Sequence, residues 1–158
     1  MESLTFARTV HVLAVVVWIG GVALVTSVLL PAIRSLPDHE NPFELFERIE
    51  NRFARQARVV TLIAGGSGLY MLWESNGWGR YLDLRFWWLH AMTFVWALFS
   101  LVLLVLEPLV LHRRLHERAQ RDPKGTLAFI QRAHWLLLGI SLLTLAGAVA
   151  GSHGWAWF

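Results

Sequence analysis

Four long apolar runs, separated by polar segments, dominate the hydrophobic pattern of this chain. They cover Val10–Leu30, Val59–Trp73, Phe86–Leu111 and Trp135–Ala150. A helix needs about 20 residues to cross about 30 Å of hydrocarbon, and the first and third runs reach that length. The other two are shorter and are extended by flanking residues, the second by Arg58, whose long side chain reaches toward the interface. We predict four membrane-spanning helices, because an open chain in lipid satisfies its backbone only as helix.

The polar segments carry start signals for two of these helices. Asn41-Pro42 and Asp122-Pro123 each place a capping side chain before a proline, which is favoured at the first helical position. Behind Pro42 apolar residues recur at helical spacing, so the second helix is expected to begin well before its apolar run. The predicted helices cover residues 4–30, 42–74, 86–118 and 123–152. The fold class is therefore predicted to be all-α: one integral membrane domain over residues 1–158, with four transmembrane helices in an up-down-up-down bundle.

Composition agrees with a membrane protein and indicates its orientation. Hydrophobic residues make up 56% of the chain, and the mean hydropathy is +0.49. Segments 31–58 and 112–133 hold eleven of the fourteen Lys and Arg residues, and basic loops stay in the cytoplasm. Both termini are then expected on the periplasmic side of a bacterial-type plasma (inner) membrane. The net charge of +3 is interpreted as this bias and not as a nucleic-acid-binding surface. The absence of Cys excludes disulfides, thiolate metal sites and iron–sulfur clusters.

Two histidines, His11 and His90, fall inside apolar runs at matched depth near the external side. Their helices run parallel and are diagonal partners in an up-down bundle. Diagonal axes lie about 12–14 Å apart when neighbouring axes are about 8–10 Å apart. Two imidazoles across that gap suit the two axial positions of an iron porphyrin. A histidine inside the membrane is a functional hypothesis by default, although one near the interface also binds a carbonyl or water.

The residues around this pair fit a haem b group. Arg8 and Arg85 lie at headgroup level outside His11 and His90, where the propionates of an inward-pointing haem would emerge. The face of His11 continues through Trp18 and Gly21, an aromatic wall followed by a gap for a flat ring. The predicted cofactor-binding residues are His11, His90, Arg8, Arg85, Trp18 and Gly21, with His11 and His90 as the metal ligands.

Other titratable residues lie toward the cytoplasmic side. Glu107 needs a partner at its depth, and we expect a structural ion pair, with a proton path as the alternative. The candidate partners are Arg55, Arg58 and His134. His134 itself is interpreted as an interfacial histidine. His112 and His116 have a spacing that can bind metal, but the neighbouring arginines oppose a cation, so we expect no metal there.

Three short motifs resemble those of the HemJ-type protoporphyrinogen oxidases, which are four-helix membrane proteins that bind haem b. They are His11-x6-Trp18-x2-Gly21, Gly68-Leu-Tyr-Met-Leu-Trp73 and Trp88-Leu-His90. The resemblance covers residues 4–115 in order and spacing, and it implies haem ligation by His11 and His90. HemJ-type proteins carry Lys two residues after the third-helix histidine, where this chain has Met92. The resemblance therefore implies haem binding more than porphyrinogen oxidation.

The same motifs resemble small membrane proteins grouped with the CopD copper-resistance family. That resemblance implies copper handling. The chain offers histidines and scattered methionines for such a role, among them Met71 and Met92, but has no Met-rich tract of the kind suited to Cu(I). Copper is therefore the second candidate cofactor after haem b.

Three functions follow from these residues. The first is a haem b membrane protein that transfers electrons, as a relay or as an oxidoreductase that exchanges with a quinone or a periplasmic partner. The second is copper transport or resistance. The third is an assembly subunit without a cofactor, which packs through its glycine faces on a larger complex. A homo-oligomer is kept separately as a candidate partner. The sequence leaves the substrate, the redox partner and the oligomeric state open.

Overall fold

The structure, a computed structural model, describes residues 2–37 and 42–155, apart from the side chain of His112. None of these residues forms a strand, so the all-α class predicted from the sequence is confirmed for the described chain. The first helical segment runs without a break through α1 (Glu2–Leu24), the π-helical turn η1 (Val25–Leu29) and α2 (Leu30–Arg34).

The rest of the chain forms three further long segments. The second segment is α3 (Pro42–Glu74). Two short 3-10 helices, η3 (Gly77–Leu82) and η4 (Leu84–Phe86), lead into the third, which comprises α4 (Trp87–Leu101), the π-helix η5 (Val102–Leu111) and α5 (His112–Arg121). The fourth segment is α6 (Pro123–Ser152). The predicted bounds of the second helix coincide with α3, whereas the first and third segments continue about one turn beyond prediction toward the basic loops.

Local chemistry explains where these segments begin and widen. The Asp122 carboxylate accepts a hydrogen bond from the Gly125 N–H at 2.8 Å, which confirms the predicted start at Pro123. The other predicted cap, Asn41, lies outside the described residues. Both π-helical turns occur at a proline, with Pro31 just after η1 and Pro108 inside η5. A proline has no N–H for the carbonyl four residues before it, so the helix is free to widen there.

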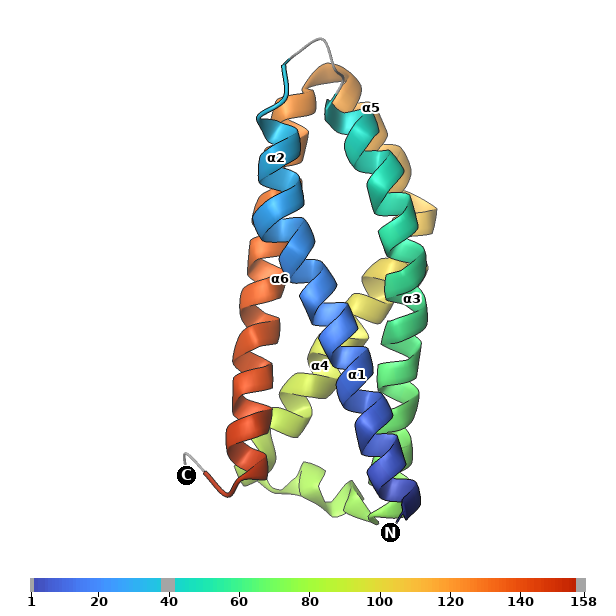
Figure 1. Cartoon of the computed structure of the whole chain (residues 1–158), viewed down its shortest axis with the longest axis vertical. Helices are drawn as coiled ribbons and strands as arrows, with labels where there is room; N and C mark the ends of the chain where they lie inside the picture. Colours follow the sequence, from blue (N-terminus) through green and yellow to red (C-terminus); the bar gives the residue numbers. More distant parts are fainter. Residues whose placement is uncertain (1, 38–41, 156–158) are drawn as a thin grey trace.

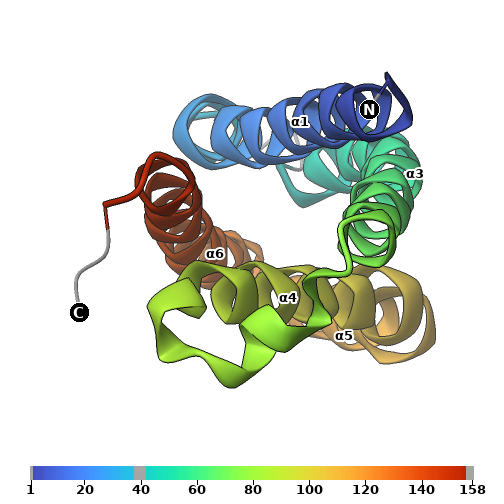
Figure 2. The same cartoon turned by 90° about the horizontal axis from the view of Figure 1, so that it is seen from below.

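The four long segments stand side by side along one axis (Figure 1). Seen from one end, α1 and α4 lie on opposite sides, with α3 and α6 between them (Figure 2). The most extensive packing is of α1 on α3 and of α4 on α6. The start of α1 and the end of α6 lie at one end of the molecule, which we call the terminal end. The opposite end carries α5 and the start of α3, and we call it the loop end.

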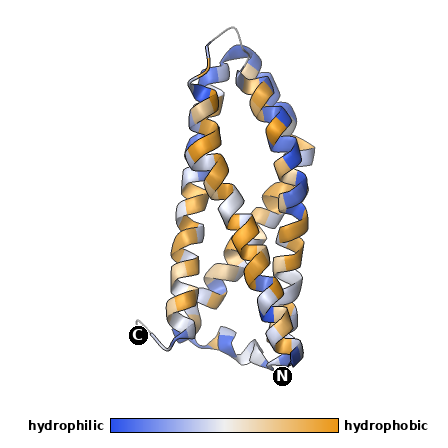
Figure 3. Ribbon diagram, viewed as in Figure 1, coloured by the Kyte–Doolittle hydropathy of each residue, from blue (hydrophilic) through white to orange (hydrophobic). Residues whose placement is uncertain are grey.

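Two apolar clusters hold the segments together. The central cluster surrounds the buried side chains of Trp18, Ala64 and Phe99, from α1, α3 and α4. The second cluster lies at the loop end around Leu30 and Phe46, of which 0% and 1% of the surface is exposed. Figure 3 shows apolar residues along the middle of α1 and along most of α6, whereas the half of α3 nearest the loop end is mostly polar. Burial of these side chains fixes how the helices contact one another.

Three segments are long and apolar enough to cross a membrane: Glu2–Arg34, Leu84–Leu111 and Pro123–Ser152. Many of their large apolar side chains point outward, for example Leu13 with 59% and Leu143 with 68% of its surface exposed. Such surfaces are costly in water and ordinary in lipid, so the chain has the character of a membrane protein. The remaining segment, α3, is not among the three, because its first half is charged and its apolar part is short.

Candidate functional site

His11 has a defined orientation between α1 and α3. Its Nδ1 lies 2.9 Å from the carbonyl oxygen of Ala64 and 3.1 Å from the Ser67 hydroxyl. A carbonyl oxygen only accepts, so Nδ1 carries the proton in this contact and Nε2 keeps its lone pair. A Cβ added at Gly68 would lie 3.3 Å from Cε1 of His11, so Gly68 leaves room for the ring. A metal-binding histidine is commonly fixed in this way, through a hydrogen bond from the nitrogen that does not bind the metal.

His90 makes a different contact near the start of α4. Its Nε2 donates to the carbonyl oxygen of Tyr81 at 3.1 Å, and the two rings meet edge-on with centroids 5.2 Å apart. The Tyr81 hydroxyl and the Thr93 hydroxyl are 2.7 Å apart, so Tyr81 is bound to α4 at two points. Nε2 of His90 is therefore occupied as a donor. Ligation of a metal through that nitrogen requires His90 to release Tyr81.

The two histidines have separate partners because α1 and α4 cross. The crossing is marked by the edge-on contact of Trp18 with Phe99, whose ring centroids lie 4.9 Å apart at 90°. Beyond this point the two helices diverge toward the terminal end (Figure 1), so that α1 approaches α3 and α4 approaches α6. The rings of Trp87 and Trp88 from α4 lie against Gly147 and Gly151 of α6, where a Cβ would overlap them, so these two glycines allow close packing of α4 on α6. The sequence predicts parallel diagonal helices, and the structure differs because α1 and α4 cross.

The other predicted cofactor residues occupy varied surroundings. Trp18 is 4% exposed, and its indole N–H has no hydrogen-bond partner among the described residues. Gly21 does leave a gap, but the ring of Phe53 from α3 fills it. Arg8 is exposed on the first turns of α1. The gap beside Gly21 therefore serves helix packing in this structure, while the buried Trp18 N–H is a donor that a bound group could use.

Arg85 has a partner that the sequence analysis missed. Its Nη2 donates to the Asp83 carboxylate at 2.7 Å, and Nε donates to the same oxygen at 2.9 Å. Hydrogen bonds from the Arg85 side chain hold the pKa of Asp83 below its ordinary value. The Asp-x-Arg spacing was visible in the sequence and is a common local arrangement at a helix start. A propionate at Arg85 would compete with Asp83.

Toward the loop end, the Arg58 guanidinium binds two acceptors on the π-helix η5. Its Nη2 pairs with the Glu107 carboxylate, and its Nε donates to the Leu103 carbonyl at 3.0 Å. In a π-helix that carbonyl would pair with the N–H five residues later, which is Pro108 and has no N–H. Arg58 therefore satisfies a backbone carbonyl that Pro108 leaves open, together with a carboxylate. The predicted ion pair of Glu107 is confirmed, and Arg58 is the partner among the three candidates.

His134 bonds only within its own helix in the contacts described. Its Nδ1 donates to the Ile130 carbonyl at 2.9 Å, four residues before it. This contact fits the interpretation of an interfacial histidine satisfied by local backbone. The side chain of His112 is not described, so its predicted lack of a metal stays a prediction.

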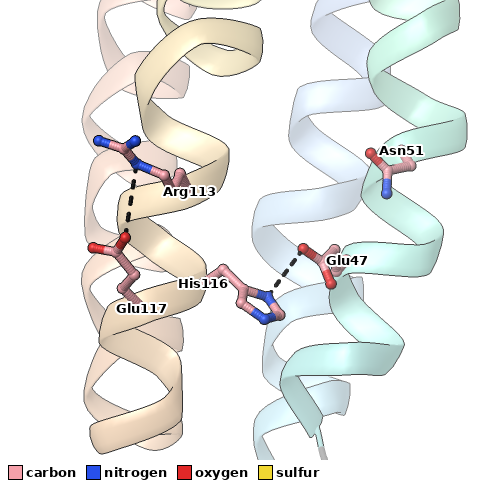
Figure 4. Close-up of a pocket in the computed structure, with 5 residues that line it drawn as sticks. All are labelled: Glu47, Asn51, Arg113, His116 and Glu117. Atoms are coloured by element: carbon pink, nitrogen blue, oxygen red, sulfur yellow. Dashed lines mark ion pairs between the residues drawn. The ribbon is translucent and has the colours of Figure 1, made fainter.

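An open groove of about 550 Å³ separates α3 from α5 at the loop end (Figure 4). Its lining consists of Glu47, Asn51, Arg113, His116 and Glu117. His116 Nδ1 lies 3.6 Å from a Glu47 carboxylate oxygen across the groove, and Arg113 lies 3.7 Å from Glu117 on the same helix. From the sequence, His116 was expected only as half of a histidine pair. The acidic face of α3 opposite it was the signal that would have suggested the contact.

Histidine, aspartate and glutamate side chains do not gather into a group of three or more suited to a metal ion anywhere in residues 2–37 and 42–155. The titratable side chains described above contact other protein groups instead, for example Arg58 with Glu107 and Arg85 with Asp83. In comparisons with known proteins, no family model, no curated protein and no solved structure matches the chain.

Proposed function

We propose that the chain is an integral membrane protein with four transmembrane helices that binds haem b and transfers electrons. The fourth span is the apolar part of α3. It lies between charged ends, and its side chains at Val59, Leu62 and Leu69 are each at least half exposed, as in a surface that faces lipid. Beside these side chains, Gly65 receives the ring of Trp96 from α4. These contacts support a span that packs inside the membrane despite its modest length.

The orientation rests on the basic residues. The loop end carries most of the Lys and Arg side chains, so we place it in the cytoplasm and the terminal end in the periplasm of an inner membrane. The histidine pair then lies near the periplasmic surface. A redox centre at that depth exchanges electrons with a quinone or a periplasmic partner.

The orientation of His11 is the observation that carries the haem proposal. Its Nδ1–H is held by Ala64, Nε2 keeps a lone pair, and Gly68 makes room for the ring, which is how a protein prepares an axial imidazole. A bound haem supplies one-electron chemistry. The chain fixes the ligand, offers the buried Trp18 N–H as a donor and excludes water with its apolar central cluster. His90 fits as a second ligand only after it leaves the Tyr81 carbonyl.

The test is the spectrum of the detergent-purified protein and of three histidine variants. We expect a Soret band with sharp bands after dithionite reduction. His11→Ala should lose most of the haem, and His90→Ala should lose it or turn it high-spin. His134→Ala is the matched control and should retain the wild-type spectrum, because His134 bonds within its own helix toward the loop end. Full occupancy with an unchanged low-spin spectrum in His11→Ala would contradict the proposal.

A cofactor-free assembly subunit is the second candidate, favoured by one observation. Both histidines already have backbone carbonyl partners, Ala64 for His11 and Tyr81 for His90. A colourless protein without bound metal would select this function, and a colourless protein with stoichiometric copper would select copper handling. The same purification therefore separates the three functions.

A further inference from the structure

The chain turns sideways at the terminal end, where α3 stops. Asn76 ends the helix with a φ of 48°, in the left-handed region that Asn tolerates better than most residues. The η3–η4 segment, residues 77–86, then runs across the terminal end at the level of the start of α1 (Figure 1). Seen from that end, the segment bulges outward beside α4 (Figure 2). It therefore extends past the ring of helices toward the surroundings of the bundle.

Polar contacts fix the orientation of this segment. The Tyr81 carbonyl accepts from His90, and the Tyr81 hydroxyl lies 2.7 Å from the Thr93 hydroxyl, so Tyr81 is held on α4. The Asp83 carboxylate accepts from the backbone N–H of Arg85 at 2.9 Å, which stabilises the start of η4. Tyr81 and Asp83 thus point back to protein groups.

The leucines that alternate with these two residues have the opposite surroundings. Leu82 is 91% exposed and Leu84 is 79% exposed. Trp78 of η3 and Trp73 at the end of α3 are exposed as well. One exposed apolar side chain is ordinary on a protein surface, but four large ones within one short segment are unfavourable in water. This concentration indicates a partner that is itself apolar.

The position of the segment indicates that this partner is lipid. Leu84 is the first residue of Leu84–Leu111, a segment long and apolar enough to cross a membrane, so η4 is continuous with a surface of that kind. Tryptophan is enriched at the boundary between membrane and water, because its ring is apolar and its N–H is polar. Residues 74–86 carry two carboxylates and two guanidinium groups, so their net charge is zero. Apolar burial, and not an excess of charge, is therefore the available driving force.

We propose that the η3–η4 segment is an interfacial anchor, which lies in the lipid headgroup layer and inserts Leu82 and Leu84 at the boundary with the acyl chains. Its partner is the bilayer itself, bound through the apolar side chains as in helices that lie in the plane of a membrane. The anchor holds the end of α3 and the start of α4 at one depth. It rests on the membrane-spanning part of the proposed function and not on haem binding.

The absence of Cys allows a direct measurement of depth, because a single introduced cysteine is the only site that a thiol-reactive spin label modifies. Leu82→Cys and Leu84→Cys place the label on side chains that are already exposed. Leu13→Cys on α1 is the lipid reference, and Gln120→Cys, exposed on α5 at the loop end, is the aqueous reference. The full chain is placed in phosphatidylcholine nanodiscs. Collision rates of each label are then measured with oxygen, which concentrates in lipid, and with a water-soluble nickel chelate.

We expect the ratio of oxygen to nickel collisions at Leu82 and Leu84 to be several-fold higher than at Gln120 and lower than at Leu13. A ratio equal to that at Gln120, with a lipid-like ratio at Leu13, would refute the anchor and leave the membrane spans intact. An aqueous ratio at Leu13 as well would overturn the membrane proposal together with the anchor. Low collision rates with both reagents at Leu82 would show contact with a protein, either a second copy or another chain, and would also refute the anchor.

Lipid composition tests the driving force. Because the net charge of the segment is zero, the collision ratio at Leu82 should be the same in nanodiscs that contain phosphatidylglycerol. A ratio that becomes lipid-like only in the anionic bilayer would show that charge attracts the segment and would contradict insertion through the leucines.

Discussion

Two adjacent glycines of α3 provide a sharp test of how this helix packs. A Cβ added at Gly65 would overlap the indole ring of Trp96, whereas a Cβ at Gly66 would meet no atom within 4 Å. The Trp96 indole N–H donates to the Thr61 carbonyl at 3.0 Å. Thr61 lies one helical turn before Gly65. Gly65→Ala must therefore displace a ring from α4, and Gly66→Ala places a methyl group on an open helix face.

The expected effects have opposite signs. Overpacking of a filled contact destabilises by about 1–3 kcal/mol, and loss of the Trp96 hydrogen bond adds about 0.5–1.5 kcal/mol. The higher helix propensity of Ala compared with Gly offsets about 1 kcal/mol of this loss in the free energy of unfolding. We expect Gly65→Ala to destabilise by about 1–3 kcal/mol, whereas Gly66→Ala should be neutral or stabilise by up to about 1 kcal/mol.

Thermal unfolding in one detergent, followed by circular dichroism, measures the difference between the two variants. Trp fluorescence gives a second readout, because displacement of Trp96 changes its surroundings. Equal Tm values for Gly65→Ala and Gly66→Ala would refute the argument and would show that α3 does not hold α4 through Gly65. The contact between Gly65 and Trp96 would then no longer support the proposal that α3 is a fourth transmembrane span.

Three further predictions concern charge and orientation. Glu107→Gln should lower the free energy of unfolding by about 1–3 kcal/mol, because Arg58 loses its ionic partner. Any haem spectrum should stay unchanged. Glu117→Gln is the control: it removes an exposed ion pair and should change the free energy of unfolding by at most about 0.5 kcal/mol. Equal losses would contradict a special role for Glu107. Burial, then the charge of Glu107, then that of Glu47, raise the pKa of Glu50 from its ordinary 4.5 to about 7. The folded state therefore binds its proton more tightly, so stability should fall by at most about 3 kcal/mol as pH rises from 4.5 to about 7. Glu50→Gln should flatten that slope, and an unchanged slope would assign it to other groups. A reporter active only in the cytoplasm, fused after the last residue, should give no signal, and strong activity there would reverse the proposed orientation.

Hydrophobic pattern and helix-start chemistry were enough to locate the helices. The run of apolar residues and the Asp122-Pro123 start predicted the fourth helix, and the structure has α6 from Pro123 to Ser152. These features act over a few neighbouring residues, so they are readable along the chain. The need of Glu107 for a cation was also readable, because a carboxylate at that depth is costly when unpaired.

The identity of that cation was decided by tertiary structure. Arg55, Arg58 and His134 were equivalent by sequence, and only the π-helix at Pro108, with its open Leu103 carbonyl, gives Arg58 a second acceptor beside Glu107. The space beside Gly21 was predicted to receive a flat cofactor ring, whereas its occupant in this structure is Phe53, which is distant in sequence. Which side chain fills a space depends on which helix faces it.

The candidate site shows the same division most clearly. The sequence by itself determined that the chain is helical, that His11 and His90 lie in apolar helices, and that the charges gather toward the loop end, because these properties follow from residue order and local periodicity. Only the tertiary structure decided that α1 and α4 cross at Trp18 and Phe99 and diverge beyond them. That crossing gives His11 the Ala64 carbonyl and His90 the Tyr81 carbonyl. Helix crossing is set by how side chains of separate segments interlock, and this interlocking has no periodic signature in the sequence.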